Sequence, residues 1–366
     1  MIHRRSLLKC GAGALAAAAA VMRTGGVSAG ETPAFAPQPG PWRSFEIRTR
    51  VELPTSKGAA RAWVPTPSFA ADEWTRPGET RFTGNADASD RIDGPVGMVV
   101  AEWRSGAETP VLEVVSRVST RDRAVAPDGG GAGLSAEDRA KYVAATRLIP
   151  TDGVVARRAA EIVGSRTDDR EKAEAIYQWV VENTHRDAKV RGCGLGDVAT
   201  MLESGNLGGK CADINALYVG LARAAGLPAR DVYGIRVAPS RFGYKSLGAN
   251  SETITKAQHC RAEVWLDGVG WFPVDPADVR KVALEEPPTK LALDDPKVLA
   301  ARKALFGSWE TNWLAYNDAH DVKLPGSQTG PLGFFMYPQA ETVAGLLDCL
   351  DPDTFRYAIT AREVTA

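Results

Sequence analysis

The sequence predicts an α+β protein in which a β-rich N-terminal module, residues 42–125, precedes a mixed helical and β core, residues 135–285. Apolar and polar residues alternate strictly from Ser44 to Leu53, which is typical of a half-buried strand. Later in the chain, apolar residues recur at helical spacing after Asp168 and again after Cys211. Strands first and helices later favour an α+β arrangement.

Length and charge narrow the function classes. The chain has 366 residues, which suggests about two domains, and its hydrophobic content of 44% is sufficient for a normal core. With 44 basic and 45 acidic residues the formal net charge is −1. This balance gives no indication of a nucleic acid or an anionic membrane surface as a partner.

Residues 1–29 have the features of an export signal. Arg4 and Arg5 are followed by leucines and Lys9, then by an uncharged alanine-rich run and the small-residue site Val27-Ser28-Ala29. The paired arginines favour a twin-arginine signal over an ordinary secretory one. We therefore expect a periplasmic or secreted protein that meets the twin-arginine export machinery. The apolar run is too short to be a stable membrane span.

Shorter strand-like runs continue the N-terminal module at 61–64, 97–103 and 110–118, separated by Gly, Pro and Asp. A glycine-rich linker follows at residues 126–134. Its glycines do not form a G-x-G-x-x-G motif between a strand and a helix, so a dinucleotide cofactor is not expected.

The core begins with helical signals. Asp168 with Glu171 three residues later resembles a capping box, and a second helix runs from Cys211 to the breaker Gly226-Leu227-Pro228. Residues 286–366 are expected to form a largely irregular C-terminal extension packed on the core, closed by a strand at 356–364.

Cys211 follows a glycine-rich turn and begins the second of these helices. The unpaired N–H groups and the helix dipole at such a position favour the thiolate, which is the nucleophilic form. We expect the thiol to be partly exposed in a cleft. The alternative is a small buried cysteine at a helix start. A phosphate-binding loop is excluded because Ser204 replaces its first glycine and Cys211 its metal-binding hydroxyl.

His259 lies at the start of a strand-like run that ends at Leu266. Alternation places His259 and Arg261 on a mostly polar face and Cys260 on the apolar face. We therefore interpret His259 as a catalytic histidine and Cys260 as a structural residue that points away from it. Adjacent residues of a strand cannot both reach one ion, so zinc is only a weak alternative.

A turn at residues 267–270 returns the chain so that Asp275 comes back beside His259. A two-residue turn would place Asp275 on the opposite face of the hairpin from His259. The sequence therefore predicts a loop of odd length or a bulge. In chain order, Cys211, His259 and Asp275 are the groups that thiol-based acyl transfer requires.

Around these residues the chain resembles a known family. The segments Gly209-Lys210-Cys211, 221–230, His259 with Glu263, and Gly270-Trp271 with Asp275-Pro276 are similar to those of the transglutaminase-like superfamily, over roughly residues 165–280. The resemblance implies a papain-like core, with helices packed on an antiparallel sheet, and a Cys211–His259–Asp275 triad acting on amide carbonyls. Arg261 departs from the family, many members of which carry Trp two residues after the histidine.

The expected function is that of an exported thiol enzyme acting on amide bonds of peptides or proteins, a peptidoglycan peptide among them, through a thioester. Hydrolysis and acyl transfer both remain open. The Cys211 N–H would hold part of the oxyanion, with Asn206 as a candidate second donor. No cofactor and no metal are expected. The alternative is a non-catalytic periplasmic binding or scaffold protein with the same fold.

Overall fold

The computed structural model describes residues 34–365 except 55–57, 105–107, 127–129 and 132. The expected export signal at residues 1–29 therefore lies outside the described residues. Within the described part of the chain, no helix combines the length and apolar character that crossing a membrane requires.

A four-stranded antiparallel sheet forms the centre of the core. Its strands, in spatial order, are β12 (Gly270–Val274), β11 (Gln258–Leu266), β10 (Ala229–Arg236) and β14 (Trp313–Asn317). All nine residues of β11 are buried, because the sheet is covered on both faces. The core is thus a sheet with helices packed on it, and the α+β prediction is confirmed.

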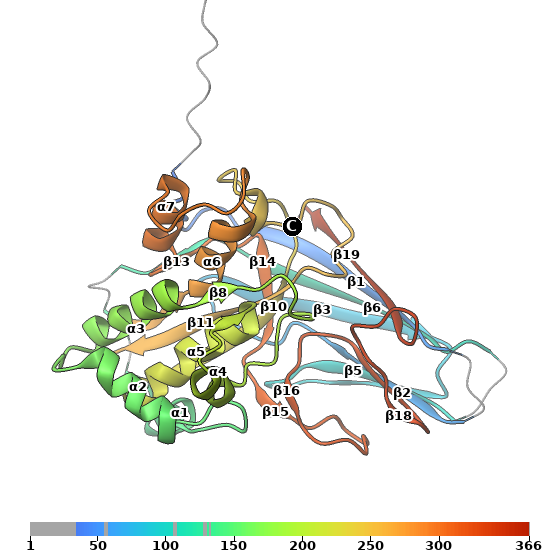
Figure 1. Cartoon of the computed structure of the whole chain (residues 1–366). Coiled ribbons are helices and arrows are strands. Elements are labelled where there is room, and N and C mark those ends of the chain that lie inside the picture. Colours follow the sequence, from blue (N-terminus) through green and yellow to red (C-terminus); the bar gives the residue numbers. More distant parts are fainter. Residues whose placement is uncertain (1–33, 55–57, 105–107, 127–129, 132, 366) are drawn as a thin grey trace, which may run out of the picture. The chain divides into compact units, whose positions relative to one another are not determined.

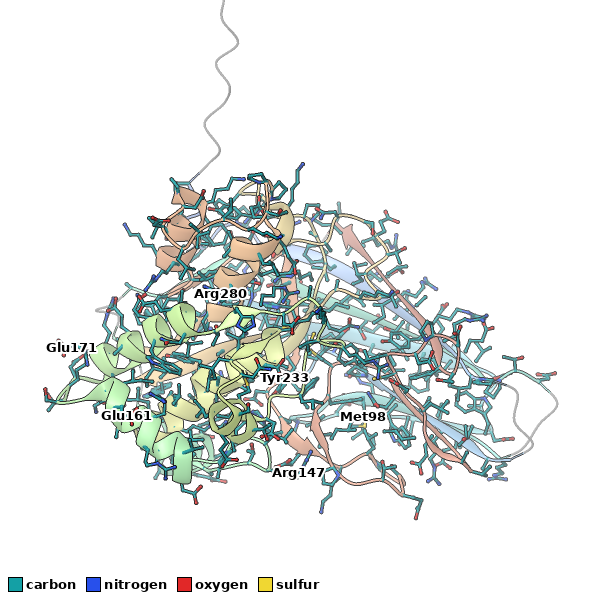
Figure 2. All side chains as sticks on the ribbon, in the orientation of Figure 1. Met98, Arg147, Glu161, Glu171, Tyr233 and Arg280 are labelled. Atoms are coloured by element: carbon teal, nitrogen blue, oxygen red, sulfur yellow. The ribbon has the colours of Figure 1, made fainter. Side chains whose placement is uncertain are left out.

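A group of helices packs on one face of this sheet, with the helix that begins at Cys211 in direct contact with β10 and β11 and other helices packed around it (Figure 1). The described helices are α1 (Ala136–Val143), α2 (Gly153–Val163), α3 (Asp169–Asn183), α4 (Val198–Ser204), α5 (Cys211–Ala224), α6 (Pro276–Glu285) and α7 (Pro296–Ala304). α5 packs against β10 and β11 and is itself surrounded by α2, α3 and α6, so almost all of its residues are buried. Arg280 of α6 donates to the Val181 carbonyl of α3 at 3.2 Å (Figure 2).

The predicted starts of α3 and α5 are observed. The Asp168 side chain accepts the Glu171 N–H at 2.9 Å at the start of α3, as the capping pattern indicates. α5 begins at Cys211, and its last turn is followed by Gly226, whose φ is 84°. Glycine adopts this left-handed conformation without the steric penalty of a side chain, which is why the helix ends there.

Two further antiparallel sheets combine strands of residues 43–120 with strands of residues 339–364. One has the order β19-β1-β6-β3, with β1 (Arg43–Glu52), β3 (Thr75–Gly84), β6 (Val111–Thr120) and β19 (Arg356–Val364). The other has the order β18-β17-β2-β5-β4, with β2 (Ala60–Pro65), β4 (Ala88–Ile92), β5 (Met98–Trp103), β17 (Gln339–Thr342) and β18 (Gly345–Leu346). The strands β3 and β4, which are mostly polar and partly exposed, lack the alternation that would have predicted them.

Residues after 285 contain more regular structure than expected. They provide α7, the β14 edge of the central sheet, and the strands β17 and β19, which pair with β2 and β1. The remaining strands are short: β7 (Arg123–Ala124), β8 (His185–Arg186), β9 (Gly208–Gly209), β13 (Ser308–Trp309), β15 (His320–Val322) and β16 (Leu332–Phe334). The C-terminal segment therefore completes sheets on both sides of the molecule. The expectation that it is largely irregular is wrong, because its strands are short and lie next to distant parts of the chain.

Candidate active site

The turn before α5 fixes the position of Cys211, the first residue of the helix. The Asp213 carboxylate, in the first turn of α5, accepts the N–H groups of Lys210 and Gly196, both at 2.9 Å. A Cβ at Gly209 would lie 2.5 Å from the Cβ of Asp213, so only glycine fits there. The glycine-rich turn thus brings the backbone close to Asp213 and leaves the Cys211 side chain at the N-terminus of the helix.

The hairpin of β11 and β12 has the predicted odd-length loop. Leu266 pairs with Gly270, and the loop between the strands consists of residues 267–269. This register places Asp275 on the same face of the hairpin as His259. His259 Nε2 lies 2.8 Å from Asp275 Oδ2. The structure therefore brings these two residues together, in the manner the loop-length argument requires.

A second carboxylate, that of Asp278, also approaches His259. Its Oδ2 lies 3.4 Å from His259 Nε2, and its Oδ1 lies 2.5 Å from Arg236 Nη2. Burial and the Arg236 guanidinium disfavour the charged imidazole, but the Asp278 and Asp275 carboxylates outweigh them and raise the pKa of His259 to about 9. The imidazole is therefore protonated at neutral pH.

Cys211 is buried, with only 3% of its surface exposed, although it lines a cavity. The expectation of a partly exposed thiol is wrong, because the helix start is covered by the neighbouring loop and strand. Hydrogen bonding with the Cys193 and Cys260 side chains and then with His259 holds the pKa of the Cys211 thiol well below its usual range, against the effect of burial. The site accordingly favours a thiolate beside a protonated imidazole.

Two of these neighbours were not expected from the sequence. Cys260 belongs to the face of β11 opposite His259, yet its side chain interacts with Cys211, and the interpretation of Cys260 as remote from the site is wrong. Cys193 lies in the loop before α4, and its carbonyl accepts the Ala212 N–H at 2.9 Å. The Cys211 interaction and burial raise the pKa of the Cys193 thiol, and burial and the Cys211 interaction raise that of the Cys260 thiol, so both stay neutral. The Cys193 thiol donates to the Gln258 carbonyl at 3.3 Å.

Asp275 caps the N-terminus of α6 while it holds His259. Its Oδ1 accepts the Asp278 N–H at 3.0 Å and the Asn215 side-chain amide at 3.3 Å. The same Asn215 amide nitrogen lies 2.8 Å from the Cys260 carbonyl, so it ties α5 to β11. These bonds fix the carboxylate that orients the imidazole.

Arg261, two residues after His259, is fully enclosed. Its guanidinium lies over the Trp313 ring, 4.8 Å from the centroid, and donates to the Glu310 carbonyl at 2.9 Å. Its Nε is 3.5 Å from Asp275 Oδ2. Arg261 thus adds a positive charge beside the Asp275 carboxylate.

His259, Asp275 and Asp278 are the one set of side chains among the described residues whose spacing could suit a metal ion. The guanidinium of Arg236 bonds directly to Asp278, and that of Arg261 lies beside Asp275. Two cations already compensate these carboxylates, and a divalent ion there would be repelled by both. The arrangement fits a protonated imidazole better than a metal.

Cys211 and His259 line the same cavity, whose volume is about 680 Å³. Asn206 does not line it. This residue is exposed, and its side-chain oxygen accepts the Gly208 N–H at 3.1 Å. The structure therefore separates the suggested oxyanion donor from the thiol, because the β9 turn directs Asn206 toward solvent.

Three residues around the imidazole and its carboxylate were missed by the sequence analysis. Asp278 has a readable signal, because Asp275-Pro276 followed by Asp278 is the pattern of a capped helix start. Arg236 and Asn215 have none, since they lie on β10 and α5 and reach the site only through tertiary packing.

Comparison with known proteins identifies the family of the chain. The sequence model of the transglutaminase-like superfamily matches residues 156–276. A protein of Haemophilus influenzae described as uncharacterized is 38% identical over 328 residues, covering 84% of this chain and 88% of the relative. The chain belongs to the transglutaminase-like superfamily.

A solved structure shows the same fold at low sequence identity. The crystal structure of a candidate cysteine protease from Cytophaga hutchinsonii aligns with a TM-score of 0.50 and 13% identity, covering 89% of this chain and 99% of that one. The periplasmic domain of TgpA from Pseudomonas aeruginosa aligns with a TM-score of 0.37 and 16% identity, covering 66% and 88%.

Proposed function

We propose that this protein is a thiol enzyme that acts on amide bonds of peptides or proteins through a thioester at Cys211. The observation that carries the proposal is the joint placement of Cys211, His259 and two carboxylates. It combines a thiol of lowered pKa at a helix N-terminus with an imidazole whose pKa is raised to about 9.

In the proposed mechanism the Cys211 thiolate attacks the amide carbonyl carbon. The Cys211 N–H supports the oxyanion, since the next N–H, that of Ala212, already donates to the Cys193 carbonyl. His259 gives its proton to the leaving amine and becomes neutral. Because Nε2 is held by Asp275, Nδ1 is the ring nitrogen left for this transfer.

The resulting thioester is resolved by water or by a second amine. Neutral His259 removes a proton from the acceptor, and collapse of the second tetrahedral intermediate returns the thiolate and the imidazolium. Water yields an amidase or protease, and an amine yields acyl transfer. Mass spectrometry of candidate peptides, with and without an added primary amine, would separate these two outcomes.

Selective alkylation tests the reactive thiol directly. Cys349 lines the same cavity, and burial raises the pKa of its thiol, so it serves as an internal control. Iodoacetamide at pH 6.5 should label Cys211 at least about tenfold faster than Cys349, because only Cys211 is a thiolate. Cys211→Ala should abolish acyl-enzyme formation in intact-mass spectra, whereas Cys349→Ala should retain it. Equal labelling of the two thiols would favour the non-catalytic binding protein.

We also propose that the protein acts in the periplasm and reaches it by the twin-arginine route. The support is the sequence of residues 1–29, with Arg4 and Arg5 ahead of an apolar run. Replacing both arginines with lysine should leave the precursor in the cytoplasm, as fractionation would show. Export that continues unchanged would contradict the twin-arginine route.

A further inference from the structure

The cavity that holds Cys211 and His259 carries a strong excess of positive charge. Six basic residues line it, against the single acidic residue Glu285: they are Arg186, Arg191, Lys210, Arg236, Lys256 and Lys281. The whole chain has a formal net charge of −1, so this excess is a local property of the site.

Four of the six basic residues are paired with carboxylates. Arg236 is paired with Asp278, and Arg191 is paired with Asp348 at 2.8 Å. Arg186 and Lys281 share the one carboxylate of Glu285, which leaves one positive charge in excess.

Lys210 and Lys256 are the two cations of the cavity that remain unpaired. Within the part of the chain that the structure describes, neither ammonium group forms an ion pair or hydrogen bond. Lys210 is half-buried and directly precedes Cys211, and Lys256 is exposed and lies three residues before His259. Two lysines without a partner thus line the same cavity as Cys211 and His259.

The cavity also has an apolar side. Ile254, Tyr337, Leu350 and Phe355 line it together with the cations. An occupant that matches both halves combines a hydrophobic group with a negative charge. Arginine binds phosphate most effectively because its guanidinium is a bidentate donor, but the arginines of this cavity are already paired with carboxylates. The two unpaired lysines each offer a single point charge.

We infer that the acyl donor of this site is a peptide with a carboxylate close to the scissile amide, bound by Lys210 and Lys256. This inference rests on the proposed function and specifies its substrate class. The carboxylate compensates charge that the protein leaves unpaired, and it would raise the local concentration of acidic peptides near Cys211. The lysines act by binding and positioning, and they take no part in proton transfer.

The first experiment compares two alkylating reagents that differ in charge. Iodoacetate is an anion and iodoacetamide is neutral, and both attack the same thiolate. We expect the rate with iodoacetate divided by the rate with iodoacetamide, both at Cys211, to be lower by about threefold to tenfold in Lys210→Gln/Lys256→Gln at low salt. Raising the salt concentration should lower the same ratio in the wild-type protein by a similar factor. Lys323→Gln, which removes an exposed lysine outside the cavity, is the matched control and should leave the ratio unchanged.

The outcomes separate the two proposals. If Cys211 reacts with neither reagent, the proposed thiol chemistry fails. If it reacts with both at a ratio that the double variant does not change, the reactive thiol stands and the inferred preference for anions is overturned. Unchanged melting temperatures of the lysine variants would show that the ratio reports charge and not unfolding.

The second experiment uses matched peptides with Glu or Gln next to the cleaved amide. The Glu peptide should have a KM lower by about threefold to tenfold, with kcat little changed, and this advantage should vanish in the double variant. Equal KM values for the two peptides in the wild-type protein would refute the inference while leaving amide cleavage intact.

Discussion

Among the described residues, two histidines lie beside buried aspartates, and the two imidazoles are in opposite electrostatic states. His259 Nε2 lies 2.8 Å from Asp275, and His320 Nε2 lies 3.5 Å from Asp231. The pKa of His259 is raised to about 9, whereas burial and the Arg223 guanidinium lower that of His320 to about 3. An aspartate close to a histidine is therefore not sufficient to make the histidine positively charged.

The surroundings of each pair explain the difference. His259 faces two carboxylates that are further fixed by a helix N-terminus and by Arg236. His320 lies beside one carboxylate, and burial raises the pKa of this Asp231 to about 7 although Arg223 opposes it.

The two sites also differ in access. His320 Nδ1 is 3.4 Å from the Tyr233 hydroxyl and does not line the cavity, whereas His259 lines it together with the Cys211 thiol. Of these two histidines, only His259 has two carboxylates beside it and lines the cavity.

The largest expected effect concerns the stability cost of Asp231. Its folded-state pKa of about 7 exceeds the ordinary value of 3.8, so between pH 4 and pH 7 the unfolded chain ionises while the folded one does not. Stability of the wild type should therefore fall over this range. Asp231→Asn should remove this loss, so that its free energy of unfolding relative to the wild type increases by up to about 4 kcal/mol between pH 4 and pH 8. Urea unfolding of both proteins at each pH would measure the difference.

The effect of Asp278→Asn on the free energy of unfolding should depend on pH in the opposite direction to that of Asp231→Asn. Burial works against ionisation, but Arg236 and then His259 hold the pKa of Asp278 well below its ordinary value. The ionised carboxylate therefore stabilises the folded state above the ordinary pKa, and that contribution is lost as the pH falls through the folded pKa. Parallel pH profiles for the two variants would invalidate the contrast between the sites.

The next effect concerns the thiol. His259→Gln should slow alkylation of Cys211 at pH 6.5 on the order of a hundredfold, because the thiolate loses its imidazolium partner. His320→Gln should leave the rate within about twofold, since that neutral ring has no role at the thiol. The rates can be measured by peptide mapping with labelled iodoacetamide. A comparable loss in both variants would indicate a general structural effect.

The smallest effect separates the two carboxylates that hold His259. Asp278→Asn keeps the shape of the side chain but removes one negative charge, so the pKa of His259 should fall from about 9 by roughly one unit. Imidazole NMR would follow this titration, and the upper pH limit of acylation should move down with it. His320, observed in the same spectrum, should remain neutral from pH 5 to pH 9. An unmoved His259 titration would assign the raised pKa to Asp275 alone.

The sequence by itself determined the parts that depend on local pattern. Alternation in 44–53 and 259–266, the helix start at Cys211 and the odd loop before Asp275 all follow from periods of a few residues and from turn chemistry. These features sufficed to single out Cys211, His259 and Asp275 and to predict the α+β class.

Only the tertiary structure decided which distant segments meet. β19 pairs with β1 across most of the chain, β14 completes the central sheet, and Arg236 of β10 reaches Asp278 of α6. A strand pattern specifies which face is buried but not which strand lies beside it. The raised pKa of His259 and the unpaired lysines of the cavity depend on such meetings, because charge compensation is set by distance in space and not by separation along the chain.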